Sequence, residues 1–176
     1  ADSALQFDGQ TSVEIAKSSS LDMTSADFTV YARIKTKSDG TIFAKAPTDG
    51  RWEPNAKALF VRGGRLCYDI GWVGAVQTDQ QVNDGQWHHV AHVFDDATNL
   101  GQRIYVDGQL VASGSRDRSD FNCDTRLRIG RVIEVTAQHE GTRVLRRDIG
   151  REVVADLFHV AVAVVAQHAA VEHGAT

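Results

Sequence analysis

The chain has 176 residues, of which 42% are hydrophobic and 24% are charged, a length and composition typical of one soluble globular domain spanning residues 1–176. Its net charge of −4 comes from interspersed acids and bases, so the sequence offers no basic face for nucleic acid, and no apolar stretch is long enough for membrane insertion. Fifteen glycines against two prolines favour a turn-rich all-β protein. The chain starts at Ala1 without a charged and apolar leader, the pattern of a mature export product or of a domain cut from a longer protein.

The first part of the chain predicts three strands. Segments Leu5–Phe7 and Val13–Ile15 alternate apolar and polar residues on either side of Asp8-Gly9, which predicts a hairpin. The next strand, Phe28–Ile34, also alternates, so its apolar residues share one face and Tyr31 lies on the other.

A long surface loop is predicted over residues 46–55, which hold both prolines, a glycine and Trp52. After it, residues 58–70 have the pattern of a hairpin closed by Gly63-Gly64, and a two-residue turn sets the register of its strands. We expect the face that carries charged residues to be wet at the turn and partly covered farther along. The predicted register pairs Val61 with Leu66 and Leu59 with Tyr68 on a core face that Ile70 continues, and Arg62 with Arg65, Phe60 with Cys67 and Ala58 with Asp69 on the other face.

Residues 82–114 have the pattern of the centre of an antiparallel sheet. A turn at Asn83–Gly85 precedes an apolar and aromatic run, and we expect Trp87 in that run to lie in the core. A second two-residue turn, at Asp107-Gly108, predicts a hairpin whose faces are both partly apolar, so we expect both to be covered. Its predicted register pairs Ile104 with Val111 and Tyr105 with Leu110.

The segment N-D-G-Q-W-H-H-V-A, from Asn83 to Ala91, is followed by R-I-Y-V-D-G, from Arg103 to Gly108. Together they resemble the central signature of the laminin-G-like, concanavalin A-like jelly-roll family. Upstream, Ala4–Ala16 and Phe28–Thr36 are similar to the opening F-D-G strand and the long second strand of that family. The resemblance covers residues 4–131 and implies an all-β fold, an antiparallel β-sandwich of the jelly-roll type.

The C-terminal segment 132–176 is atypical, since it has no tryptophan or tyrosine and holds four of the seven histidines. Residues 126–130 before it predict a last strand of the familiar type. The family closes with a strand that pairs near the N-terminus, and we assign that role to Val153–Ala166, which is rich in β-branched residues. A helix over Ala155–Glu172 is the alternative.

Two kinds of chemistry are not expected, acid-pair glycoside hydrolysis and zinc binding. A glucanase of this fold needs two carboxyl groups on one strand face, as in an E-x-D-x-E spacing, and neither the isolated glutamates nor Asp95-Asp96 supply it. His88 and His92 would share one strand face and His89 the other, so the three are not expected to bind one metal ion. We expect His92 to be a neutral core histidine.

Calcium is the metal that the resemblance implies, because laminin-G-like domains often hold Ca²⁺ with loop aspartates and backbone carbonyls. No spacing ranks the candidate ligands in this sequence. They are Asp8, Asp79, Asp95, Asp96 and Asp107.

The chain has two cysteines, Cys67 on a predicted strand and Cys123 just before another. In an exported protein a disulfide between them would persist and staple the two strands. Two buried thiols are the alternative.

The tryptophans outside the signature are the candidates for ligand binding. Trp52 lies in the predicted loop, where a tryptophan either caps the sheet or meets a ligand. Trp72 follows the hairpin, and continued alternation would place it on the core face, with ligand binding as the alternative. A sugar ring packs its C–H face on an indole, while planar donors and acceptors bind its hydroxyls. The predicted site therefore contains Trp52, Arg51, Arg62, Asp69 and Trp72.

The resemblance implies a non-catalytic carbohydrate-binding or adhesion module of an exported and larger bacterial protein. Such a module would act outside the cell, in the periplasm or at the cell surface, with a glycan or glycoconjugate as its partner. The first alternative is a protein-interaction or structural module without glycan binding, and the second is an enzyme of unrecognised type. The step from fold to function is an analogy.

Overall fold

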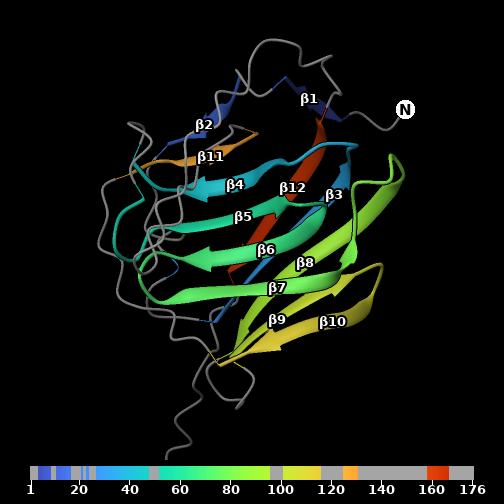
Figure 1. The fold of residues 1–176 in the computed structure, drawn as a ribbon. Helices are drawn as coiled ribbons and strands as arrows, with labels where there is room; N and C mark the ends of the chain where they lie inside the picture. Colours follow the sequence, from blue (N-terminus) through green and yellow to red (C-terminus); the bar gives the residue numbers. More distant parts are fainter. Residues whose placement is uncertain are drawn as a thin grey trace, which may run out of the picture.

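The computed structural model describes residues 4–8, 11–16, 21, 23, 27–47, 52–95, 101–115 and 125–130, together with the backbone of residues 158–166. These residues form two antiparallel sheets of six strands, sheet A in the order β1-β12-β3-β8-β9-β10 and sheet B in the order β2-β11-β4-β5-β6-β7 (Figure 1). The strands are β1 (Leu5–Phe7), β2 (Val13–Ile15), β3 (Phe28–Lys35), β4 (Gly40–Lys45), β5 (Lys57–Arg62), β6 (Arg65–Ile70), β7 (Gly74–Gln81), β8 (Trp87–Asp95), β9 (Gly101–Val106), β10 (Gln109–Gly114), β11 (Leu127–Ile129) and β12 (Phe158–Ala166).

The core lies between the two sheets. The alternation of β3 turns its apolar residues inward, as predicted, and they meet the inward residues of β5 and β6 from the other sheet. Burial of each large apolar side chain contributes about 1.5–3 kcal/mol, so this layer holds the sandwich together. Central members of the core are Val30, Ile34, Phe43, Leu59, Leu66, Tyr68, Val90 and Ile104.

The β5–β6 hairpin has the predicted register, from Val61 opposite Leu66 to Ala58 opposite Asp69. Its turn residues, Gly63 and Gly64, have φ values of 58° and 77°, which glycine adopts without steric cost. The Asp39 carboxylate accepts hydrogen bonds from both turn amides, at 2.7 and 2.9 Å. The two glycines and the hydrogen bonds to Asp39 therefore fix the turn. The turn then sets which residues lie on each face of the hairpin.

The prediction that Trp87 lies in the core is wrong. In β8 the inward positions belong to His88, Val90, His92 and Phe94, which are buried. Because strand side chains alternate, Trp87 lies on the outer face of sheet A and is half-buried there.

The β9–β10 hairpin was predicted in part. Tyr105 pairs with Leu110 as expected, but an irregularity after Leu110 makes Ala112, not Val111, the partner of Ile104. The expectation that both faces are covered is also wrong, since β10 is the edge of sheet A and Leu110 is 49% exposed.

The first predicted hairpin is absent, because β1 and β2 belong to different sheets. β1 pairs with β12 in sheet A, whereas β2 pairs with β11 in sheet B. Of the strand expected at Val153–Ala166, residues 158–166 form β12 between β1 and β3, so the helix alternative is wrong for them, and residues 153–157 lie outside the described residues. The predicted strand at residues 126–130 is β11.

Candidate functional site

The predicted loop tryptophan, Trp52, packs on the outer face of sheet B. It is half-buried against two small clusters, one formed by Ala44, Ala58, Phe60 and Cys67 and one by Ala46 and Ala56. The hairpin register places Ala58 and Cys67 on this outer face, where their small side chains leave space for an indole. Trp52 thus caps the far part of this face, while the turn end stays exposed at Arg62 and Arg65, as the sequence predicted.

The turn after β6 brings a second tryptophan to the same end of sheet B. The Asn55 amide donates to the Gly71 carbonyl at 2.7 Å, and the Gly71 amide donates to the Ala56 carbonyl at 2.8 Å. These bonds join the loop that carries Trp52 to the turn that carries Trp72. Two turns distant in sequence therefore form one surface.

Trp72 is 63% exposed, so the prediction that it lies on the core face is wrong. The alternation ends with β6 at Ile70, and the chain turns at Gly71–Val73. Trp72 has a φ of 66°, in the left-handed region that bulky side chains rarely occupy. Asn55, at the other side of the shared contact, has a φ of 67°. Asparagine adopts this conformation readily, so the unfavourable one is that of Trp72. Unfavourable backbone conformations concentrate at functional sites, which makes the turn of Trp72 the strongest candidate.

The polar residues of the predicted site lie at opposite ends of the β5–β6 hairpin. Asp69 pairs with Ala58 near the tryptophans, whereas Arg62 is next to the turn and stacks its guanidinium 5.2 Å from the Phe60 ring. Four residues along β5 separate their positions, about 13 Å. We define the tryptophan site as Trp52, Trp72 and Asp69, with Arg62 at its far edge. Arg51 lies outside the described residues.

Cys67 is buried beneath Trp52 and carries a free thiol in this structure. Burial raises the pKa of this thiol to about 12, so it stays protonated at neutral pH. Cys123 lies outside the described residues. The disulfide between them stays a prediction, which thiol titration of denatured, unreduced protein tests; two free thiols would rule it out.

The candidate calcium ligands that the structure describes do not converge. Asp8 accepts two hydrogen bonds from Thr11, Asp79 lies 3.6 Å from Arg65, and Asp95 pairs with Arg103. Asp96 lies outside the described residues. Within the described part of the chain no three acidic, histidine or cysteine side chains form a group that could hold a metal. Calcium binding stays a prediction without assigned ligands.

The three histidines of β8 lie on two faces as predicted, His88 and His92 on the inner face and His89 on the outer one. His88 lies between two carboxylates, 2.8 Å from Asp107 and 3.1 Å from Asp84, and so joins the turn before β8 to the turn after β9. Burial would lower the pKa of His88, but the hydrogen bonds to these carboxylates outweigh it and the pKa is raised. His89 lies on the opposite, exposed face.

His92 is fully buried, as expected of a neutral core histidine. Its Nε2 lies 3.0 Å from Oε1 of Gln102, and its ring stacks on Tyr68 with 3.6 Å between centroids. Burial lowers the pKa of His92 to about 3, so the ring is uncharged at neutral pH.

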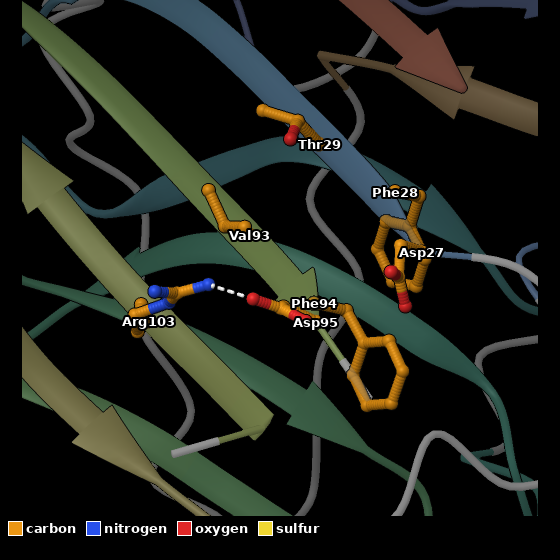
Figure 2. A pocket seen from close by; sticks show the side chains of 7 residues that line it. All are labelled: Asp27, Phe28, Thr29, Val93, Phe94, Asp95 and Arg103. Carbon is orange, nitrogen blue, oxygen red and sulfur yellow. Dashed lines mark hydrogen bonds and ion pairs between the residues drawn. The ribbon is translucent and has the colours of Figure 1, made fainter. Parts of the chain in front are cut away.

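A pocket that the sequence did not predict lies on sheet A where β3 and β8 meet the end of β9 (Figure 2). It has a volume of about 300 Å³, small for a ligand site, and a stacked phenylalanine pair lies beside a charged rim. In the rim, Asp95 and Arg103 form an ion pair at 2.6 Å. The lining residues come together only through the pairing of three strands, so no local sequence motif predicts this pocket. The lining residues are Asp27, Phe28, Thr29, Val93, Phe94, Asp95 and Arg103.

No helix among the described residues could span a membrane.

A family model described as the concanavalin A-like lectin/glucanases superfamily matches residues 7–139. A search of curated proteins found no match.

Three solved structures illustrate the likeness. The LG1-3 region of the laminin alpha2 chain is 18% identical with a TM-score of 0.57, covering 90% of this chain and 30% of that chain. Domains LG4-5 of the mouse laminin alpha1 chain are 18% identical with a TM-score of 0.47, covering 94% and 44%. An endo-beta-1,4-glucuronan lyase from the fungus Trichoderma reesei is 11% identical with a TM-score of 0.48, covering 92% and 73%. The chain thus spans less than half of either laminin chain. At 18% identity the likeness to the laminin alpha2 region shows the fold alone.

Proposed function

The chain belongs to the concanavalin A-like lectin/glucanase superfamily, and we propose that it is a non-catalytic carbohydrate-binding module whose glycan binds at the tryptophan site. The fold hosts lectin-like and adhesion modules, so the choice among functions rests on the site. We further propose that it acts outside the cytoplasm as part of a longer protein.

The observation that carries this proposal is the exposure and the backbone conformation of Trp72. An indole that is 63% exposed loses most of the stabilisation that burial would provide, and its φ of 66° adds backbone strain. Neither feature helps the fold. Both are accounted for if the indole is held outward to stack on a sugar ring.

The surroundings of Trp72 suit a sugar. The hydrogen bonds through Gly71 fix the turn against the loop of Trp52, so little order would have to be gained on binding. Asp69, half-exposed on the neighbouring strand, provides carboxylate oxygens for the hydroxyls at the edge of a ring. The acid pair of a glucanase is missing from the sequence, so hydrolysis of that type is not expected at this site.

The experiment is a glycan array run with and without calcium, followed by calorimetric titration of the best neutral oligosaccharide. In that titration Trp72→Gly should weaken binding by about 1–3 kcal/mol, as loss of a central aromatic contact does. Because glycine accepts a positive φ, the same change should leave the melting temperature unchanged or raise it.

Leu110→Ala provides the matched control, since Leu110 is an exposed apolar residue on the other sheet. That variant should bind the glycan as the unmodified protein does. An array without any glycan ligand, or unchanged affinity in Trp72→Gly, would contradict the proposal.

A further inference from the structure

The outer face of sheet A carries a row of cationic and aromatic side chains. The register of β3 with β8 places Arg33 opposite His89 and Lys35 opposite Trp87. Tyr31 lies two residues before Arg33 and therefore on the same face. We call these five residues the β3–β8 face. It belongs to the opposite side of the sandwich from the tryptophan site.

Arg33 is held on this face by stacking. Its guanidinium lies 4.8 Å from the centroid of the Trp87 ring, a cation–π contact. Its Nε is buried without a hydrogen-bond partner, and no described carboxylate pairs with the guanidinium. A stacked guanidinium is oriented in advance and keeps its planar fork of donors for an anion.

The charge of this face is not neutralised by the described residues. Within that part of the chain, four of six arginines pair with carboxylates, whereas Arg33 and Arg62 do not. Lys35 next to Arg33 likewise forms no ion pair there. In a chain with a net charge of −4, one strand face thus carries two cations, about 7 Å apart, that no described carboxylate neutralises. The four paired arginines are Arg65, Arg103, Arg126 and Arg128.

Tyr31 and His89 add aromatic surface and polar atoms beside these cations. The Tyr31 hydroxyl and the His89 ring nitrogen Nδ1 are hydrogen-bonded, and Tyr31 is 37% exposed. An aromatic face next to fixed cations suits a ligand with both an apolar ring face and acidic groups.

We propose that the β3–β8 face binds an acidic glycan, a polysaccharide segment that carries carboxylate or sulfate groups. Arg33 and Lys35 pair with successive acidic groups, and Tyr31 packs against the sugar ring that lies beyond Arg33 along the strand. Two cations along one strand favour a chain with repeated charges over a single small anion. This site is separate from the tryptophan site and goes beyond the function proposed there.

The test is calorimetric titration of the intact protein with a heparin hexasaccharide at low ionic strength. Arg33→Gln and Lys35→Gln should each lower the affinity about tenfold, the size expected for loss of one charge-assisted contact. Arg33→Lys should lower it less, because charge remains while the fork and the stacking are lost. The matched control is Arg65→Gln, which removes the same charge from sheet B and should leave heparin affinity unchanged.

Absence of heparin binding would overturn the proposal. A loss of heparin affinity in Arg65→Gln as large as that in Arg33→Gln would also overturn it, since it would show only a general effect of charge. A poly-glutamate peptide that binds equally well and loses affinity in the same variants would also overturn it, in favour of an acidic protein segment. An excess of the neutral oligosaccharide should leave heparin bound, and displacement would show that the two ligands share one site. The melting temperature of each variant is measured alongside, and Lys35→Gln decides the matter if Arg33→Gln does not fold.

Discussion

Trp52 and Trp72 lie on neighbouring turns but differ in what they contact. Trp52 covers Ala58, Phe60 and Cys67, whereas Trp72 projects from its turn with most of its surface exposed. The sequence left Trp52 either capping the sheet or meeting a ligand, and its contacts in the structure show that it caps the sheet. The two indoles should respond differently to removal.

Trp52→Ala should lower both stability and glycan affinity. Removal of a half-buried indole uncovers the small side chains beneath it, which we expect to cost about 1–3 kcal/mol of unfolding free energy. Chemical denaturation and calorimetric titration measure the two effects. Unchanged stability would show that Trp52 does not cap the sheet.

His92 makes a residue-level prediction about pH. Its pKa is about 3 in the folded protein and about 6.5 when unfolded, so the unfolded chain takes up a proton first as the pH falls. The stability that the neutral ring contributes is therefore complete above about pH 7 and decreases as the pH falls toward 3. Between pH 7 and pH 5 the loss should be about 2 kcal/mol.

His92→Leu isolates this contribution. The variant removes the hydrogen bond between His92 and Gln102 and should be less stable at every pH, but its stability should fall less between pH 7 and pH 5. Denaturation at both pH values measures the difference. His88 acts in the opposite direction, because its raised pKa gives stability that is lost as the pH rises, and it is present in both proteins. Equal pH dependence of the two proteins would contradict the account of His92.

At the scale of elements, a two-residue turn made the register of its own hairpin predictable from the sequence. The pairing of strands that lie far apart in the sequence was not predictable in this way. Gly63-Gly64 fixed every pair in β5–β6 because such a turn leaves one alignment. The irregularity at Val111 and the separation of β1 from β2 depend on partners that neighbouring residues do not specify. Strand alternation puts Trp87 on the face opposite to His92 and Phe94 and so predicts its outward position. The large size of the tryptophan side chain led instead to the prediction that it lies in the core.

The candidate site was predicted only in part for the same reason. Composition and loop signals identified Trp52, while the contact of Gly71 with Asn55 and Ala56, which brings Trp72 beside that loop, is a tertiary feature. The pocket beside Asp95 and the β3–β8 face come from strand register alone.

Gly71→Ala tests the junction between the two turns. A Cβ at this position would lie 2.0 Å from the carbonyl oxygen of Glu53, so the turn must move away from the loop. We expect a destabilisation of about 1–3 kcal/mol together with weaker glycan binding. Gly108→Ala is the comparison, since a Cβ there meets nothing within 4 Å and only the φ of 80° is unfavourable. That variant should lose stability and keep glycan affinity, and an equal loss of affinity in both would contradict the role of the junction.

At the scale of the whole molecule, the sandwich presents two outer faces with different chemistry. Sheet B carries the capping Trp52 and the exposed Trp72 with the Asp69 carboxylate, and sheet A carries Arg33 stacked on Trp87 beside Lys35. The core between the sheets is apolar except for groups such as His92 and Gln102 that bond to each other. The fold is thus a scaffold that keeps two surfaces apart.

Because the sequence has no paired acids, the purified protein should not hydrolyse β-glucans. Reducing-end assays on common glucans measure this. Turnover that disappears when a single Asp or Glu is substituted would show an active site that the sequence pattern does not reveal.

The most direct test of glycan binding at the tryptophan site uses the three tryptophans as reporters. Each indole N–H gives its own signal in the nuclear magnetic resonance spectrum of isotope-labelled protein, and Trp87 lies on the opposite sheet from the other two. When the neutral oligosaccharide from the array is added, the signals of Trp72 and Trp52 should shift with saturation while that of Trp87 stays in place. A shift of Trp87 alone, or of none of the three, would contradict the account.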